Sequence, residues 1–166
     1  GALRVIDVSD PAMPQVVGGP VGPDLSYWAW HNDLVIADDF AYLSDIRHRI
    51  HIFDVSAPTR PTFIRPHEMP AGDTFGISVE NGLLLVAGGH SGLLIFDLSD
   101  PTLPVEIGRF DPFESIRDVE LAGKLAYLTG FSAGLMVVDL TTASAPMPVA
   151  RLAGIKGRRL TVHDSR

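Results

Sequence analysis

The stretch Gly92–Pro104, GLLIFDLSDPTLP, decides how this chain folds, because closely similar stretches occur four times. Each copy consists of an apolar run, an aspartate and a turn rich in Ser, Asp and Pro. The copies begin at Leu3, Ile50, Leu93 and Leu135, and their aspartates are Asp7, Asp54, Asp97 and Asp139. Successive aspartates are 47, 43 and 42 residues apart. A period in the low forties, built from short β-rich runs separated by Pro and Gly, is typical of β-propeller blades.

The third copy shows how one blade is built. Leu83–Ala87 (LLLVA) and Leu93–Leu98 (LLIFDL) are continuous apolar runs, whereas Phe75–Glu80 (FGISVE) and Val105–Phe110 (VEIGRF) alternate. Continuous runs predict strands that are covered on both faces, and alternating runs predict strands that are half exposed. A blade of four antiparallel strands between two neighbouring blades has this arrangement. No segment has a helical apolar period, so the sequence predicts an all-β fold.

Alignment of the copies on their aspartates predicts a single β-propeller domain, or fragment of one, over residues 1–166. The expected blades are approximately 1–23 (partial), 24–69, 70–111, 112–154 and 155–166, the last being the first strand of a further or composite blade. Fifteen strands are predicted, the last at Arg159–His163 (RLTVH). This strand either completes a composite blade that closes a small four-bladed ring, or it ends an open arc of a larger propeller. Because the composite blade would lack its second strand, we expect an open arc of about four blades.

Composition excludes several classes of partner. The 166 residues carry a formal net charge of -7, which argues against binding to nucleic acid or to an anionic membrane surface. The longest nearly apolar stretch, Gly82–Phe96, is shorter than the roughly 20 residues that span a bilayer, so membrane insertion is not expected. Without cysteine there are no disulfides, thiolate metal sites or Cys nucleophiles. Gly1 leads almost directly into a repeat, so we expect an excerpt from a longer or processed protein.

The repeated phrases resemble LVIVD repeats, a β-propeller repeat of bacterial and archaeal proteins. The resemblance is carried by ALRVIDVSDPAMPQVVG, GLLIFDLSDPTLPVEIG and GLMVVDL, with FAYLSD or LAYLTG as the preceding strand, and it covers nearly the whole chain. It implies the propeller fold and, more weakly, an exported or cell-surface location in a prokaryote. It implies no particular reaction, because members of the family mostly lack an assigned one. The fourth copy departs from the turn pattern, reading TTASAP.

The repeated aspartates are predicted to be structural. An Asp side chain can accept a hydrogen bond from the backbone N–H two residues later, and this Asx-turn ends a strand. The residues at that position are Ser9, Ser56, Ser99 and Thr141. A ring of carboxylates around a channel is the alternative interpretation. Positions that differ between the copies are therefore better candidates for function.

Two loops of each blade are expected at the face where propellers usually bind ligands: the loop before the innermost strand, and the turn between the second and third strands. These loops are predicted to place six side chains around one mouth: His31, Arg47, His48, His90, Arg117 and Arg158. The segment Ser26–Asp33 (SYWAWHND) adds Trp28, Trp30 and Asp33. Exposed aromatic rings beside His and Asp would suit a sugar, a planar ligand or a protein partner. Alternatively, the aromatic residues fill space beneath the linker at residues 18–24.

Catalytic and metal sites have less support. His31, His48 and His90, with Asp33 or Asp45, would be the metal ligands, but no pair has a recognised ligand spacing, so no metal and no cofactor is predicted. There is no G-x-S-x-G motif, and the glycines of residues 88–92 do not lead into a helix, which argues against a phosphate loop. Arg117, Arg158 and Arg159 could bind an anionic group at the mouth, with solvated surface charge as the alternative.

Three hypotheses for function follow. The leading one is a non-enzymatic binding or scaffold module that presents its channel-face loops to a protein, a glycan or a small ligand. The second is a metal-assisted or hydrolytic propeller enzyme with a His/Asp site at the channel mouth. The third is a purely structural repeat module that self-associates through open blade edges and faces.

Overall fold

The structure, a computed structural model, describes residues 2–22, 31–70, 72–112 and 114–163. Within these ranges the chain forms fourteen β-strands and no helix. The described part of the chain therefore contains no helix that could cross a lipid bilayer. The strands make one two-stranded and three four-stranded antiparallel sheets. The prediction of an all-β fold is confirmed.

Each sheet corresponds to one blade, and the strands pair in the order in which they occur along the chain. Blade 1 consists of β1 (Leu3–Asp7) and β2 (Gln15–Val21). Blade 2 consists of β3 (His31–Ala37), β4 (Phe40–Asp45), β5 (Arg49–Asp54) and β6 (Thr62–Glu68). Blade 3 consists of β7 (Ile77–Glu80), β8 (Leu83–Ala87), β9 (Leu93–Asp97) and β10 (Val105–Phe110). Blade 4 consists of β11 (Asp118–Ala122), β12 (Leu125–Gly130), β13 (Gly134–Asp139) and β14 (Met147–Leu152).

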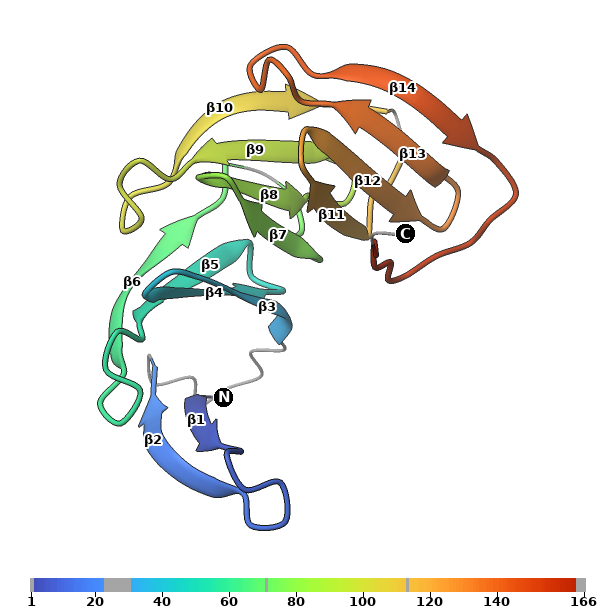
Figure 1. Cartoon of the computed structure of the whole chain (residues 1–166). Coiled ribbons are helices and arrows are strands. Elements are labelled where there is room, and N and C mark those ends of the chain that lie inside the picture. Colours follow the sequence, from blue (N-terminus) through green and yellow to red (C-terminus); the bar gives the residue numbers. More distant parts are fainter. Residues whose placement is uncertain (1, 23–30, 71, 113, 164–166) are drawn as a thin grey trace.

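The blades follow one another around an open arc (Figure 1). The first strands of the complete blades, β3, β7 and β11, lie along the inner side of the arc, and β7 contacts both of the others. After β14 the chain returns to the inner side, where the backbone N–H of Leu160 donates a 2.6 Å hydrogen bond to the Asp118 carboxylate. The fold is a β-propeller arc, as the repeat predicts, and it is not closed into a ring.

The apolar core lies between the blades. One face of blade 3, which includes Leu84, packs with Tyr42 of blade 2. The opposite face, which includes Leu85, packs with Leu128 of blade 4. Both middle strands of blade 3 are buried along most of their length. This double coverage explains their continuous apolar sequences and confirms the prediction made from them.

The repeated aspartates end the third strand of each blade by the predicted Asx-turn. The carboxylate accepts the backbone N–H of the second residue after it in all four copies, at 2.8, 2.9, 3.2 and 2.7 Å from Asp7 to Asp139. Hydrogen bonds from the following Ser or Thr hold the pKa of Asp7, Asp54 and Asp139 below the usual value. These residues therefore serve the scaffold.

The two ends of the arc differ from its interior. The predicted last strand, Arg159–His163, is not a strand within the described residues. An innermost strand pairs only with the second strand of its own blade, and the described part of the chain supplies no such partner after residue 152. At the other end, Ile36 of β3 is 64% exposed, whereas the equivalent Leu121 in blade 4 is buried. Blade 1 contributes only its third and fourth strands here, which leaves this side of β3 uncovered.

Candidate functional site

The loops before the innermost strands and the turns between second and third strands meet at one end of the blades, which we call the mouth. It is formed by residues 31–33, 46–48, 74–76, 88–92, 116–118, 131–133 and 157–159. Hydrogen bonds join the two kinds of loop directly. The Thr74 hydroxyl donates to the backbone carbonyl of Asp45, and the Ile116 N–H donates to the carbonyl of Gly89 at 2.9 Å. The predicted convergence of these loops is therefore built by backbone contacts.

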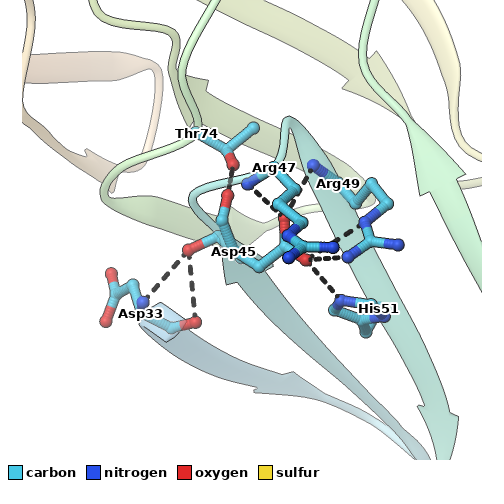
Figure 2. A network of polar contacts seen from close by, with 7 residues as sticks. Asp33, Asp45, Arg47, Arg49, His51 and Thr74 are labelled. Atoms are coloured by element: carbon cyan, nitrogen blue, oxygen red, sulfur yellow. Dashed lines mark hydrogen bonds and ion pairs between the residues drawn. The ribbon is translucent and has the colours of Figure 1, made fainter. Parts of the chain in front are cut away.

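A buried polar network centres on Asp45, the last residue of β4 (Figure 2). Its carboxylate accepts the Arg47 N–H at 2.8 Å, the Arg49 guanidinium at 2.7 Å and His51 Nε2 at 2.8 Å. Burial raises the pKa of Asp45, but the hydrogen bonds from His51, Arg49 and Arg47 outweigh it and hold the pKa below its usual value. Asp45 is therefore ionised and fully engaged at neutral pH.

This network supports the turn between β4 and β5, and it leaves little hydrogen-bonding capacity for a ligand. Asp45 and His51 are both buried, and the His51 ring packs 6.0 Å from Phe63. In contrast, Arg47 and His48 are exposed in the turn, and His48 has a φ of 62°. The network fixes the backbone from which these two side chains project.

A second group of side chains lies between blades 3 and 4 and the C-terminal segment. The Arg117 Cζ atom is 3.9 Å from the centroid of the Phe75 ring and 5.3 Å from that of Phe131. The Arg158 Cζ atom is 5.0 Å from the Phe131 centroid. These four residues, here named the arginine–phenylalanine cluster, line a cavity of about 380 Å³ together with Gly76, Asp118 and Arg159.

The backbone around the cluster is held on several sides. The Arg117 N–H donates to the Thr129 carbonyl at 2.7 Å, and the Arg117 carbonyl accepts the Gly76 N–H at 3.1 Å. Position 76 has no side chain because a Cβ there would overlap the carboxylate of Asp118. Arg117 is half-buried, whereas Arg158 is exposed. The cavity is thus part of a rigid junction between blades, which suits pre-organised binding.

Below the mouth, carboxylates line the inner wall of the arc. Asp33 accepts the Ile77 N–H at 3.1 Å, and two junctions further on the Asp118 carboxylate accepts the Leu160 N–H. Burial raises the pKa of Asp118 and of Glu120, and the negative charge of Asp33 adds to the increase. These three residues share a second cavity, of about 510 Å³, with Arg159. The cavity of the cluster is therefore lined by three arginines and Asp118, and the second cavity by three carboxylates and Arg159.

The raised pKa of Asp118 gives a pH dependence with a defined sign. A carboxyl group with a higher pKa in the folded state destabilises the fold when it is ionised, so the free energy of unfolding should rise as pH falls from neutral through that pKa. Asp118→Asn keeps an oxygen acceptor for the Leu160 N–H but removes the titration. We expect urea denaturation from pH 7 down to the unfolded-state value of about 4 to show a smaller rise for Asp118→Asn. An unaltered pH profile would contradict this account of Asp118.

The predicted site residues divide between different places. Arg117 and Arg158 meet in the arginine–phenylalanine cluster, and Asp33 lies on the channel wall, where its carboxylate is 3.7 Å from the Arg159 guanidinium. His90 is exposed in the turn between β8 and β9 and does not line the cluster's cavity. The described side chains include no group of three or more His, Asp or Glu placed to hold a metal ion.

Most of the aromatic segment Ser26–Asp33 lies outside the residues that the structure describes. Trp28 and Trp30 lie outside the described residues, and only the backbone of His31 is described, opposite Asp45 in the sheet. The proposed pairing of this segment with Arg47 and His90 therefore stays a prediction.

Sequence reasoning passed over Phe75 and Phe131 as site residues. Both stand in the mouth loops at positions where the copies differ. One position in the alignment could have identified Phe75. It precedes Asp33, Gly76, Asp118 and Arg159, and successive copies have Asn32, Phe75, Arg117 and Arg158 there. Phe75 and Arg117 occupy it in neighbouring blades, which brings the two side chains into contact.

Comparison with known proteins agrees with this architecture. The LVIVD repeat model matches residues 1–19, 29–66, 71–112 and 115–152, whereas no curated protein matches the chain. Similar solved structures include the β-propeller domain of Myceliophteria thermophila Cps50 (Swd1), at TM-score 0.67 and 14% identity over 94% of this chain and 55% of that one. A chain of a mitotic checkpoint complex gives TM-score 0.64 at 14% identity, over 87% of this chain and 44% of that chain.

The glutaminyl cyclase of Myxococcus xanthus is also similar, with TM-score 0.53 and 16% identity over 81% of this chain and 56% of the cyclase. At such identities the likeness concerns the fold alone. The chain spans about half the length of the solved structures it matches. The family model, by contrast, matches most of the residues, in four repeats that coincide with the four blades. This chain belongs to the LVIVD repeat family and forms a β-propeller arc.

Proposed function

We propose that this chain is a non-enzymatic binding or scaffold module that receives a ligand at its mouth, in the cavity of the arginine–phenylalanine cluster. One observation carries the proposal: the guanidinium groups of Arg117 and Arg158 converge on Phe131 without a carboxylate partner. Within the described part of the chain, neither forms an ion pair. Other arginines of the chain, such as Arg49 and Arg109, are paired with carboxylates.

The composition of the cavity supports the same function. Its lining comes from four separate stretches of chain, and it combines aromatic surface with a few polar groups. A concave site of this size with convergent polar groups is typical of small-ligand binding. The lining residues of blades 3 and 4 belong to loops held by backbone hydrogen bonds, so binding would require little reordering of these loops.

A titration with small probes tests the position of the site. Benzoate, benzamide and glucose are added separately to the 15N-labelled protein, and backbone amide shifts are followed. We expect at least one probe to shift the amides of Gly76, Arg117 and Gly130 at the mouth, without shifting Asn81 and Gly123 at the opposite end of the strands. Phe131→Ala should weaken this response. Shifts confined to the opposite end, or none at all, would contradict the proposed function.

The uncovered faces of the arc favour a second, structural function. Tyr42 is buried against blade 3 and its hydroxyl donates to the Pro101 carbonyl at 3.0 Å, whereas the equivalent Tyr127 of blade 4 is only half-buried. Likewise, Ile64 packs against blade 3, but the equivalent Val149 is 60% exposed. Blade 4 therefore presents outward the same apolar positions that join blades inside the arc, a face suited to another blade-like sheet.

Association through this face can be measured directly. We expect multi-angle light scattering to show a molecular mass that increases with protein concentration. Val149→Arg should reduce the association because the charge would have to be desolvated in the contact. It should leave the free energy of unfolding nearly unchanged, since Val149 is exposed within one chain. A strictly monomeric wild-type chain at millimolar concentration would count against this function.

The enzymatic alternative stays a prediction. It would require a metal or a nucleophile at the mouth near His31, His48 and His90. Stoichiometric zinc, iron or manganese in the reconstituted protein, lost in His90→Ala, would favour it over a binding module.

A further inference from the structure

We propose that the ligand of the mouth is bound through an anionic group, a carboxylate or a phosphate, held by Arg117 and Arg158. This inference rests on the proposed binding function and specifies the chemistry of the ligand.

Stacking occupies the faces of a guanidinium group and leaves its edges free. Arginine carries five N–H donors in the plane of the group and no acceptor. In Arg117 one face lies over the Phe75 ring, and Phe131 is also in contact range. Its Nε atom is buried and donates no hydrogen bond within the described part of the chain. A buried donor without an acceptor is costly, so Arg117 has hydrogen-bonding capacity that the described part of the chain does not use.

The charges around the cavity favour an anion. Three arginines line it, and Asp118 is the carboxylate among the lining residues. Asp118 already accepts the Leu160 N–H, and Arg159 is paired with Asp33, so Arg117 and Arg158 provide the positive charge that remains. In the second cavity, Asp33, Glu120 and Asp118, which lines both cavities, would repel an anionic group. An anion is therefore attracted to the mouth and stopped there.

A neutral sugar fits the cluster less well. Sugars bind to aromatic residues by stacking on an exposed ring face. Here Arg117 lies over the Phe75 ring, and Arg117 and Arg158 both contact the Phe131 ring. These favourable cation–π contacts would have to be broken or shared. An anion instead uses the free edges of the guanidinium groups and leaves the stacking intact.

Benzoate and benzamide form a matched pair for the test, because they differ in charge while keeping similar shape. Each is titrated into the full chain at constant ionic strength and pH 7, followed by the amide shifts of Gly76, Arg117 and Gly130; inorganic phosphate is a third probe. We expect benzoate or phosphate to bind at the mouth at least about tenfold more tightly than benzamide. Arg117→Gln and Arg158→Gln should each weaken anion binding by about tenfold or more.

The control is Arg60→Gln, which removes the same charge from an exposed residue in the turn between β5 and β6, at the opposite end of the strands. It should leave binding unchanged within about twofold. A second variant, Arg158→Lys, keeps the charge and should lose less affinity than Arg158→Gln. Denaturation curves verify that each variant is folded.

Each outcome decides the inference. If benzamide binds at the mouth as tightly as the two anions, the binding function stands and the anionic ligand is ruled out. If anions bind, but equally weakly in Arg60→Gln and in the cluster variants, the interaction is general attraction to the protein surface and the inference is also wrong. If no probe binds at the mouth, the proposed function itself fails. A benzoate–phosphate comparison identifies which of the two anions the cluster prefers.

Discussion

Asp45→Ala is expected to lower the free energy of unfolding by about 3–5 kcal/mol, which is typical when one partner of a buried charge pair is removed. The Asp45 side chain is fully buried, and it neutralises the Arg49 guanidinium while accepting from His51 Nε2. The same carboxylate accepts two backbone N–H groups of the β4–β5 turn, those of Arg47 and Arg49. Alanine would leave all of these donors without their acceptor.

Urea denaturation at pH 7 measures the loss, with Glu106→Ala as the control. Glu106 also pairs with an arginine, Arg109, but both side chains are substantially exposed, so the expected cost is at most about 1 kcal/mol. Asp45→Asn, which keeps the size of the side chain, should also destabilise the protein and serves if Asp45→Ala does not fold. Equal effects of Asp45→Ala and Glu106→Ala would show that the buried network is not a support of the fold.

The contribution of Asp45 should also depend on pH. Because the pKa of Asp45 is lower in the folded protein, its contribution is fully present above the unfolded-state value of about 4. It is then lost as pH falls through the lower folded-state pKa. The difference in stability between wild type and Asp45→Asn should therefore shrink in acid.

Gly108→Val is expected to destabilise the chain by about 1–3 kcal/mol, the usual cost of forcing extra atoms into a packed interior. Gly108 lies in β10, and a Cβ there would overlap the backbone carbonyl of Ala143, in the last turn of blade 4. Gly18 has the same relation to the Pro58 carbonyl two junctions earlier, between blades 1 and 2. Backbone cannot rotate away as a flexible side chain can, so the blades would have to move apart.

The fourth copy provides a matched control for this prediction. Ala150 is the residue of β14 at the position equivalent to Gly108, and it is exposed because no described turn packs beside it. Ala150→Val should therefore change the free energy of unfolding by less than about 0.5 kcal/mol. If Gly108→Val were equally harmless in urea denaturation, the contact between blades would not be as tight as the structure indicates.

The scaffold was predictable because it depends on local rules. The aspartates of the repeat end strands through hydrogen bonds to residues only two positions away, so sequence spacing is sufficient to identify them. The continuous apolar runs gave the bounds of β8 correctly, as Leu83–Ala87, because both faces of this strand are covered. The strand predicted at Arg159–His163 did not form, since its pairing depends on a second strand that the described chain does not contain.

The candidate site was only partly predictable. Alignment of the copies placed Arg117 and Arg158 at the mouth. It could not show that their guanidinium groups stack on Phe75 and Phe131, because stacking depends on the direction of side chains across a blade junction. The Asp45 network could not be predicted from the sequence either. Residues 45, 49 and 51 meet around the end of one strand pair, and the other copies have glycine at the position of Asp45.

A crystal structure of the full chain soaked with benzoate tests the central claim most directly, namely that the arginine–phenylalanine cluster is a binding site. We expect the carboxylate of benzoate to lie at the mouth, within hydrogen-bond distance of the guanidinium groups of Arg117 and Arg158. The cation–π contacts to Phe75 and Phe131 should be retained. Benzoate bound elsewhere, with the cluster's cavity holding only solvent at saturating concentration, would contradict the account.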